Sequence, residues 1–429
     1  MTNNPINRTR VLFCDLLNLP RGKFVSTSYA NGGKAGFARG VFGTTYDRDL
    51  ISAPGADIYR GIPDMDLRFD DQRRVGWGFA GGYDIALGDL HVDDKPFELC
   101  ARGQLRRTVS EWQSQHGLTP MIGIELEAYV FERDDEGVFR PYDTPGAFVY
   151  GTGPQNDPEG LVDEIWNRAY AAGIPIESMN GEYDNGQFEL TLAFDEALTA
   201  CDNAFLARTL AKEVAAEMGL ILTFLPKPIP ERGGSGVHVN FSFKDEAGSN
   251  IVAPDGTLSN VAQGCVAGLM HHHEGLAGAL AHTVNSYDRL AMGSMAGYWC
   301  NWAEDHRMTT TRTTTGSPKS ARLEHRMADG GTNPYLATHA VLQAALLGVN
   351  NGYALPKPED LDGLENVRAT RHVPSNLTKS LDALEADKAL KLALGEELVD
   401  ALVYMKRDEV KRLDGKTVDQ IRDYYLPFV

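Results

Sequence analysis

The segment GEYDNGQFELTLAF, residues 181–194, contains the alternation that decides the fold. Between residues 188 and 194 every even-numbered position is apolar, whereas the odd-numbered positions from 187 to 191 hold Gln187, Glu189 and Thr191. A period of two is that of a β-strand with one apolar and one polar face. Because Glu182 and Asp184 precede Glu189, the polar side of this segment either faces water or binds something that requires carboxylates.

Three other segments repeat this construction, namely PMIGIELEAYVF (120–131), GVHVNFSF (236–243) and ARLEHRM (321–327). Alternate residues of a strand point to the same face, so each segment presents its polar side chains in a row. An ordinary antiparallel sheet with one wet face would also show this alternation. However, the polar faces contain no lysine, and methionine and aromatic residues lie beside the carboxylates, which favours an enclosed face.

Enclosed carboxylates require compensating cations, because a buried unpaired charge is costly. Arg322 and Arg326 could neutralise only part of the charge, so divalent metal ions are expected to supply the rest. Carboxylates with one histidine favour Mg²⁺ or Mn²⁺ over Zn²⁺, and their number favours two or more adjacent ions. Adjacent ions beside arginines suit phosphoryl transfer from ATP, although the sequence has no P-loop motif. The expected metal ligands are Glu125, Glu127, Glu182, Glu189, His238 and Glu324.

Composition limits the class of protein. A chain of 429 residues is expected to form two domains, and the net charge of −18 argues against nucleic acid and anionic membranes as partners. The five scattered cysteines form no CxxC pair, which predicts a reducing compartment without disulfides. No signal peptide and no run of eighteen apolar residues is found, so we expect a cytoplasmic protein.

Local patterns predict the elements outside these four strands. Short segments punctuated by Gly and Pro predict a β-rich region in the first hundred residues, with strands at 11–16, 40–46 and 64–69 and a further short segment at 76–84. Helical spacing predicts helices near 97–117, 202–219 and 387–413, the first two ending at Gly117 and Gly219. The histidines 271–273 lie in a further predicted helix, where we expect them at the surface.

Six ordered blocks resemble the glutamine synthetase superfamily over nearly the whole chain. They are RGK (21–23), GIELEAYVF (123–131), EYDNGQFEL (182–190), GGSGVHVNFS (233–242), NSYDRL (285–290) and RLEHRMADGGTNPYLA (322–337). The resemblance implies an α+β fold with a small N-terminal β-grasp domain, residues 1–98, and a catalytic domain, residues 99–429, on a curved antiparallel sheet. It also implies a homododecamer of stacked hexameric rings with active sites between subunits.

The resemblance also implies roles for individual residues. Glu127, Glu182 and Glu189 match the ligands of one metal ion, and Glu125, His238 and Glu324 those of another, with two or three Mg²⁺ or Mn²⁺ ions per site. Arg289, Arg326 and Gly234 match residues that hold L-glutamate, and Arg307 and Arg312 match those on the transferred phosphate, Arg289 and Arg307 being the expected catalytic pair. The expected nucleotide contacts are Phe194, Asn240, Ser242, Arg312, Lys319 and Arg322.

One departure from the family pattern concerns the nitrogen donor. Ammonia-using members carry a glutamate after NSYDRL, where this chain has Met295. A thioether neither accepts a proton nor binds a cation strongly, so the sequence favours ligation of glutamate to a small organic amine such as methylamine. The alternatives are an ammonia-using glutamine synthetase, a ligase for a polyamine or an aromatic amine, and a relative without catalytic activity. A second departure is Gly233, where an asparagine is usual.

Overall fold

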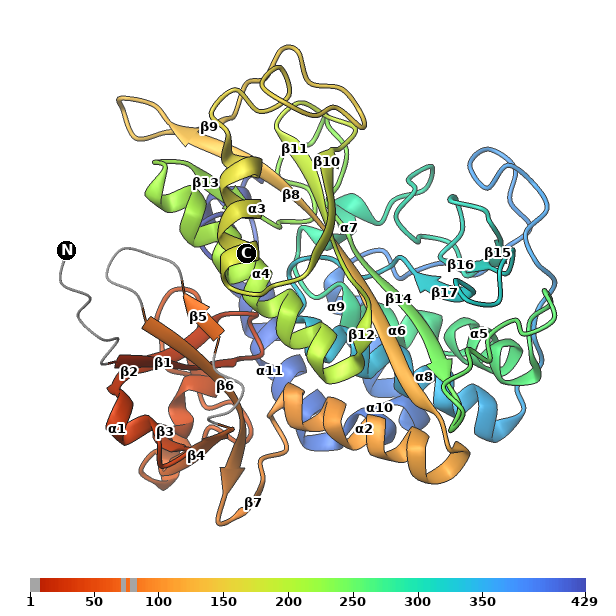
Figure 1. Ribbon diagram of the computed structural model, residues 1–429, viewed down its shortest axis with the longest axis horizontal. Helices are drawn as coiled ribbons and strands as arrows, with labels where there is room; N and C mark the ends of the chain where they lie inside the picture. Colours follow the sequence, from red (N-terminus) through yellow and green to blue (C-terminus); the bar gives the residue numbers. More distant parts are fainter. Residues whose placement is uncertain (1–7, 71–74, 78–82) are drawn as a thin grey trace.

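The computed structural model describes residues 8–70, 75–77 and 83–429. Within these residues the chain forms an α+β structure with two sheets (Figure 1). None of the helices in the described part of the chain combines the length and the apolar character that a membrane crossing requires.

The first sheet lies at one side of the molecule and has the strand order β2-β1-β6-β4-β3 (Figure 1). β1 and β6 are parallel, and the other pairs are antiparallel. The strands are β1 (Arg8–Cys14), β2 (Pro20–Ser26), β3 (Lys34–Ala38), β4 (Asp64–Phe69), β5 (Val75–Trp77), β6 (Tyr83–Val92) and β7 (Lys95–Pro96), with α1 (Thr27–Ala30) after β2.

The predictions for this region are confirmed only in part. The strand expected at 64–69 is β4, and the one expected at 11–16 overlaps β1. The strand expected at 40–46 is wrong, because Arg39–Gly43 forms a 3₁₀ turn. This turn buries Phe42 against the rings of Phe13 and Phe97, and a Cβ on Gly43 would lie 2.3 Å from the Ile51 carbonyl oxygen. The segment expected at 76–84 lies partly outside the described residues.

The second, larger sheet contains all four segments predicted to be strands with one polar face, which confirms that they are strands. Its order is β10-β11-β8-β14-β17-β16-β15, with β9, β12 and β13 also pairing with β8. Among the described strand pairs of this sheet, β15 and β16 alone are parallel. The strands are β8 (Thr119–Arg133), β9 (Phe139–Pro141), β10 (Ile176–Gly181), β11 (Gln187–Leu192), β12 (Asp195–Glu196), β13 (Ile221–Thr223), β14 (Val237–Lys244), β15 (Trp302–Glu304), β16 (Thr311–Thr314) and β17 (Arg322–His325).

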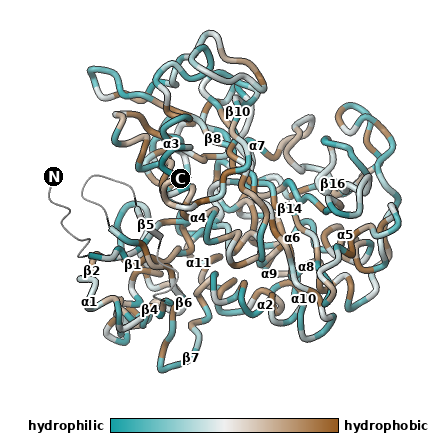
Figure 2. Tube along the Cα trace, viewed as in Figure 1, coloured by the Kyte–Doolittle hydropathy of each residue, from teal (hydrophilic) through white to brown (hydrophobic). Residues whose placement is uncertain are grey.

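Helices cover the apolar face of this sheet, so the polar face is left for the site. Ile122, Ile124 and Leu126 of β8 are buried, and Trp112 of a covering helix has its ring 4.3 Å from that of Phe243. Figure 2 shows hydrophobic residues along these inner elements and hydrophilic ones on the outer loops. The helices are α2 (Ala101–His116), α3 (Leu161–Ala171), α4 (Ala197–Glu217), α5 (Asn260–His271), α6 (His273–Leu280), α7 (Ser286–Arg289), α8 (Pro334–Asn351), α9 (Leu377–Ala386), α10 (Lys388–Leu394), α11 (Glu396–Leu413) and α12 (Val418–Tyr425).

Helices are present at all three predicted places, but some of their ends differ from the prediction. α2 ends before Gly117, which adopts a left-handed φ of 66° as a helix-terminating glycine does. α4 begins at Ala197, before the predicted start. The single helix predicted at 387–413 is two helices, because Gly395 between α10 and α11 has a φ of 100°, a conformation that no α-helix contains.

The prediction that histidines 271–273 lie at the surface is wrong for two of them. His272 is 1% exposed and lies 2.6 Å from Asp387, between its Nδ1 and the carboxylate Oδ2. His273 is 0% exposed, and burial lowers its pKa to about 4. His272 also packs against the Tyr353 ring, and His273 Nε2 lies 3.3 Å from the Tyr298 carbonyl oxygen, so both side chains have partners inside the protein.

Buried neutral histidines predict a loss of stability in acid. Burial lowers the pKa of His282 and of His339 to about 3, below the ordinary value of about 6.5. Because the unfolded chain binds these protons first, stability falls as pH drops below about 6.5, by about 2 kcal/mol per histidine between pH 7 and pH 5. In thermal unfolding, the melting temperature should fall less between pH 7 and pH 5 for His282→Gln than for the wild type. An equal fall in both proteins would mean that protonation of His282 does not cause the loss of stability in acid.

Candidate active site

The polar face of the large sheet brings carboxylates together through strand register. β8 places Glu125 opposite His238 of β14 and Glu127 opposite Glu189 of β11. β17 pairs with β14 so that Glu324 lies opposite Asn240. Side chains opposite each other in neighbouring strands lie about 5 Å apart, so residues more than a hundred positions apart in sequence meet on one face.

The first cluster consists of Glu125, His238 and Glu324, whose ligand atoms lie within 4.8 Å of one another. His238 Nδ1 lies 2.9 Å from Glu125 Oε2 and 3.6 Å from Glu324 Oε1. Burial alone would raise the pKa of Glu125, but its hydrogen bond with His238 and the amide of Asn240 lower it to about 2. This cluster is therefore ready to bind a cation without releasing a proton from Glu125.

The second cluster consists of Glu127, Glu182 and Glu189, again within 4.8 Å of one another. Burial, and then the neighbouring Glu127 and Glu189, raise the pKa of Glu182 to about 7. Burial and Glu125 raise the pKa of Glu189. The raised pKa values of both glutamates indicate an excess of negative charge that the described side chains do not neutralise.

The two clusters adjoin and fit a pair of divalent cations. His238 Nε2 lies 3.5 Å from Glu127 Oε1 and so links them. The donors are five carboxylates and one imidazole, a set suited to Mg²⁺ or Mn²⁺. The glutamates of the second cluster repel one another, and a bound cation would relieve this repulsion.

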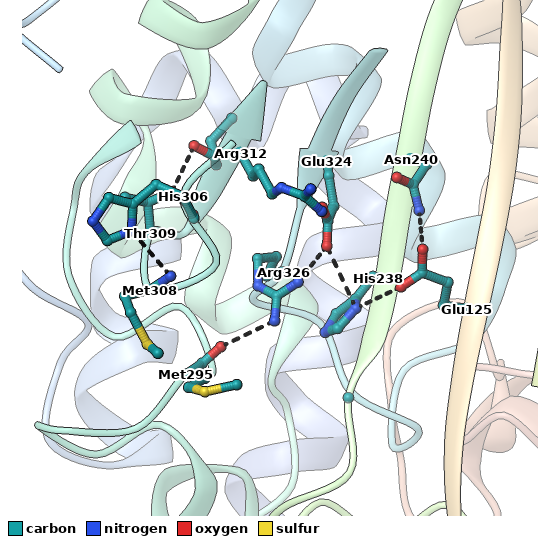
Figure 3. A network of polar contacts seen from close by, with 12 residues as sticks. Glu125, His238, Asn240, Met295, His306, Met308, Thr309, Arg312, Glu324 and Arg326 are labelled. Carbon is teal, nitrogen blue, oxygen red and sulfur yellow. Dashed lines mark hydrogen bonds and ion pairs between the residues drawn. The ribbon is translucent and has the colours of Figure 1, made fainter. Parts of the chain in front are cut away.

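Arginines border the first cluster on the side away from β8 (Figure 3). Arg326 pairs with Glu324, and its Nη2 lies 3.5 Å from the main-chain oxygen of Met295. Arg312 Nη1 lies 3.2 Å from Glu324 Oε2, and Arg312 also pairs with Asp305. Arg326 and Arg312 thus share Glu324 and lie where they can approach an anion beside the metal ligands.

Arg289 reaches the same region from α7. Its Nη1 and Nη2 donate to the carbonyls of Met327 and Arg326, each at 3.0 Å. A Cβ on Gly234 would lie 2.8 Å from Arg289 Cγ, and one on Gly236 2.4 Å from Arg289 Nη2. Glycine is needed at both positions because the backbone passes against the arginine side chain.

The GGSG loop, residues 233–236, is held in place by hydrogen bonds to residues for which the sequence predicted no role. Gln187 Nε2 donates to the Gly234 carbonyl at 2.9 Å, and Tyr129 donates to the Gly233 carbonyl at 3.0 Å. Asp184 accepts from the Gly233 amide. Alternation alone assigned Gln187 to the polar face, but its partner in a distant loop left no signal in the sequence.

A pocket of about 300 Å³ adjoins Glu125 and collects five of the six residues predicted to contact the nucleotide. Arg312 is the one not on its wall, since it lies at Glu324. The sequence missed Glu177 and Thr191, although Thr191 could have been found because it shares a strand face with Glu189. The five predicted residues on its wall are Phe194, Asn240, Ser242, Lys319 and Arg322.

Arg307 and Met295 lie on loops at the edge of this arrangement. Arg307 is exposed, in the segment between β15 and β16. Met295 is 48% exposed and adjoins Arg326 through its main chain. The position beside Arg326 is thus occupied by a thioether side chain and not by a carboxylate.

Comparison with known proteins identifies the family. The family model "Glutamine synthetase, catalytic domain" matches residues 98–425. The γ-glutamylethanolamide synthetase GlnA4 of Streptomyces coelicolor is 33% identical over 371 residues, which are 84% of this chain and 78% of that protein. The glutamine synthetase of Pyrococcus abyssi is 29% identical over 409 residues, 93% of this chain and 89% of that protein.

Solved structures agree with the sequence comparison. A crystal structure of a glutamine synthase homologue matches with a TM-score of 0.85 and 25% identity, covering 99% of both chains. GmaS in complex with ADP matches with a TM-score of 0.84 and 27% identity, covering 97% of this chain and 96% of that one. The chain therefore belongs to the glutamine synthetase family and is a ligase.

Proposed function

We propose that the protein joins L-glutamate to a small organic amine, such as methylamine or another alkylamine, at the expense of ATP. The γ-phosphoryl group of ATP passes to the side-chain carboxylate of glutamate, which gives γ-glutamyl phosphate and ADP. The amine nitrogen then attacks the acyl carbon, the C–O bond to phosphate breaks, and the nitrogen loses a proton. The products are a γ-glutamyl amide, ADP and phosphate.

The observation that carries this proposal is Met295 beside Arg326. A site for ammonium needs a carboxylate that attracts the cation and takes its proton, and a thioether does neither. One relative supports the same view, because it is named for γ-glutamylethanolamide synthesis.

The side chains of the site can be assigned to glutamate, to the transferred phosphoryl group, to ATP and to the metal ions. Arg289 and Arg326 would hold the carboxylates of glutamate, and Arg307 and Arg312 would neutralise charge on the transferred phosphoryl group. Phe194, Asn240, Ser242, Lys319 and Arg322 would hold ATP in the pocket beside Glu125. Metal ions at the two carboxylate clusters would supply electrostatic stabilisation of the phosphates.

The quaternary and domain organisation is also part of the proposal. Residues 1–98 would form a domain around the first sheet, and residues 99–429 the catalytic domain. A homododecamer of two hexameric rings would complete each site between subunits in the cytoplasm. The exposed edge position of Met295 and Arg307 supports a site that a neighbouring subunit covers.

Phosphate release with ATP, Mg²⁺ and L-glutamate, measured against a panel of nitrogen donors, tests the proposal. The panel contains ammonium, methylamine, ethylamine, isopropylamine, ethanolamine, putrescine and aniline, and mass spectrometry identifies the products. An alkylamine with a higher kcat/KM than ammonium supports the proposal. Ammonium as the best donor would favour the second candidate, an ammonia-using glutamine synthetase like the relatives with that name.

Met295→Glu should create a preference for ammonium. The new carboxylate would attract the small cation and take its proton, so kcat/KM for ammonium should rise about tenfold or more while that for alkylamines falls. Steady-state kinetics with both donors measures the ratio. Met292→Glu, which adds the same charge at a methionine that is 70% exposed three residues earlier, is the matched control. An unchanged ratio in Met295→Glu would remove Met295 as the deciding position.

A further inference from the structure

Three side-chain oxygens surround Gly233, the first residue of the GGSG loop. A Cβ on Gly233 would lie 2.9 Å from Asp184 Oδ2, 3.7 Å from Gln187 Oε1 and 4.0 Å from the Tyr129 hydroxyl oxygen. The oxygens therefore border the position that an asparagine side chain, usual in the family, would occupy. These three oxygens around Gly233 form a cradle, named here the Gly233 cradle.

The Gly233 cradle has acceptors but no cation among the described residues. The Asp184 carboxylate accepts from the Gly233 amide and lies 3.4 Å from the Tyr129 hydroxyl, both of which are uncharged. Gln187 is 4% exposed, and its buried Oε1 has no hydrogen-bond partner in the described part of the chain. Its Nε2 is already used, since it donates to the Gly234 carbonyl at 2.9 Å. A buried acceptor without a donor is costly, so the cradle suits a ligand that donates hydrogen bonds.

The Gly233 cradle lies on the polar face of the large sheet, beside the second metal cluster. Gln187 and Glu189 are alternate residues of β11, so their side chains leave the same face about 7 Å apart. At the other end of the GGSG loop, the Gly236 amide donates to Glu127 at 2.7 Å, and Arg289 packs against Gly236. The cradle thus adjoins the region where Arg289 would hold glutamate.

We propose that the Gly233 cradle binds a primary ammonium group of a substrate, with Asp184 supplying the negative charge and Gln187 a buried acceptor. An ammonium group offers one positive charge and three N–H donors, which matches a carboxylate, an amide oxygen and a hydroxyl oxygen. The inference rests on the proposed function and deepens it, because both L-glutamate and the alkylammonium ion carry such a group. Arg289 on the same loop favours glutamate, since an α-amino acid presents a carboxylate and an ammonium group on one carbon.

Kinetics of Asp184→Asn tests the inference, because the amide keeps an acceptor for the Gly233 amide and removes only the charge. Loss of the charged partner should weaken binding of the ammonium substrate by roughly 10- to 100-fold. If that substrate is glutamate, KM for L-glutamate should rise by this factor, whereas the inhibition constant of glutarate, which lacks the ammonium group, should not change. If it is the amine, KM for methylamine should rise instead. KM for ATP should stay within about twofold in both cases.

Gly233→Ala fills the Gly233 cradle without removing a hydrogen bond of the loop. Gly233 has no left-handed φ, so its backbone accepts alanine, but the new methyl group would crowd Asp184 Oδ2. This variant should raise KM for the same substrate as Asp184→Asn does. Asp245→Asn is the matched control, since Asp245 also accepts from main-chain amides, those of Ala247 and Ser249, but beyond the opposite end of β14. It should change none of these constants.

The outcomes separate this inference from the proposed function. If Asp184→Asn leaves KM for glutamate and for methylamine unchanged, the inference is wrong, and a lower kcat alone would mean that Asp184 only orders the loop. Neither result alters the preference of the wild type for an alkylamine, which tests the proposed function. Ammonium as the best donor would overturn the proposed function, while a raised KM for glutamate in Asp184→Asn would still support the cradle.

Discussion

Glu182→Gln should give a protein that is more stable without metal and almost inactive. Burial and the charges of Glu127 and Glu189 raise the pKa of Glu182 to about 7, so its ionised form destabilises the metal-free fold at higher pH. A neutral amide removes this repulsion and should raise the free energy of unfolding in chelator by about 1–3 kcal/mol at pH 8. The same change removes a metal ligand, so kcat/KM for phosphate release should fall about 1000-fold or more.

The effect of Glu182→Gln on stability should depend on pH. The folded-state pKa of Glu182 lies above its unfolded value, so the penalty appears as pH rises toward 7 and is absent below about pH 4.5. The advantage of Glu182→Gln over the wild type in thermal unfolding should therefore shrink at about pH 5, where Glu182 already carries a proton. Added Mg²⁺ should stabilise the wild type more than the variant, because ligand binding shifts unfolding by mass action.

Glu132→Gln is the matched control for this experiment. Glu132 lies on β8, the strand of Glu125 and Glu127, but is exposed beyond the site. This variant should leave activity, Mg²⁺ response and metal-free stability unchanged. If Glu182→Gln keeps activity within tenfold of the wild type, Glu182 is not a ligand of the essential metal.

Strand periodicity alone indicated which carboxylates share a strand face, because this part of the geometry is encoded in short segments. Alternation fixes which face each side chain takes, so Glu125 and Glu127 had to share a face with one another. Register between strands is not encoded so locally, yet carboxylates on three of the four polar faces and His238 on the fourth suggested a common metal site. The pairings of Glu125 with His238 and of Glu127 with Glu189 then follow from the sheet.

Features that depend on tertiary packing were not predictable in the same way. Gly395 divides a continuous helical pattern because its φ of 100° is imposed where α10 and α11 meet, and periodicity carries no information on this angle. His272 is buried because Asp387, more than a hundred residues later, forms a polar partner for it.

Arg326→Ala should weaken glutamate binding strongly and also destabilise the fold. Arg326 is 5% exposed and pairs with Glu324, which is 2% exposed. Removing one partner of a buried pair costs about 3–5 kcal/mol, because the other charge stays buried. Loss of a charged contact to substrate should raise KM for glutamate about 100-fold, with a much smaller change in KM for ATP. Steady-state kinetics and thermal unfolding measure the two effects.

The two effects of Arg326→Ala can be separated by a control and by pH. Arg102, whose side chain is 11% exposed, pairs with two carboxylates outside the site, those of Asp89 and Asp202. Arg102→Ala should therefore lose similar stability but keep the KM for glutamate. In the wild type, burial would raise the pKa of Glu324, but Arg326 lowers it. Without Arg326 the pKa of Glu324 should be higher than in the wild type, so Glu324 takes up a proton more readily and the stability gap to the wild type narrows as pH falls. A gap that is independent of pH would mean that lost packing, rather than the unpaired charge of Glu324, destabilises the variant.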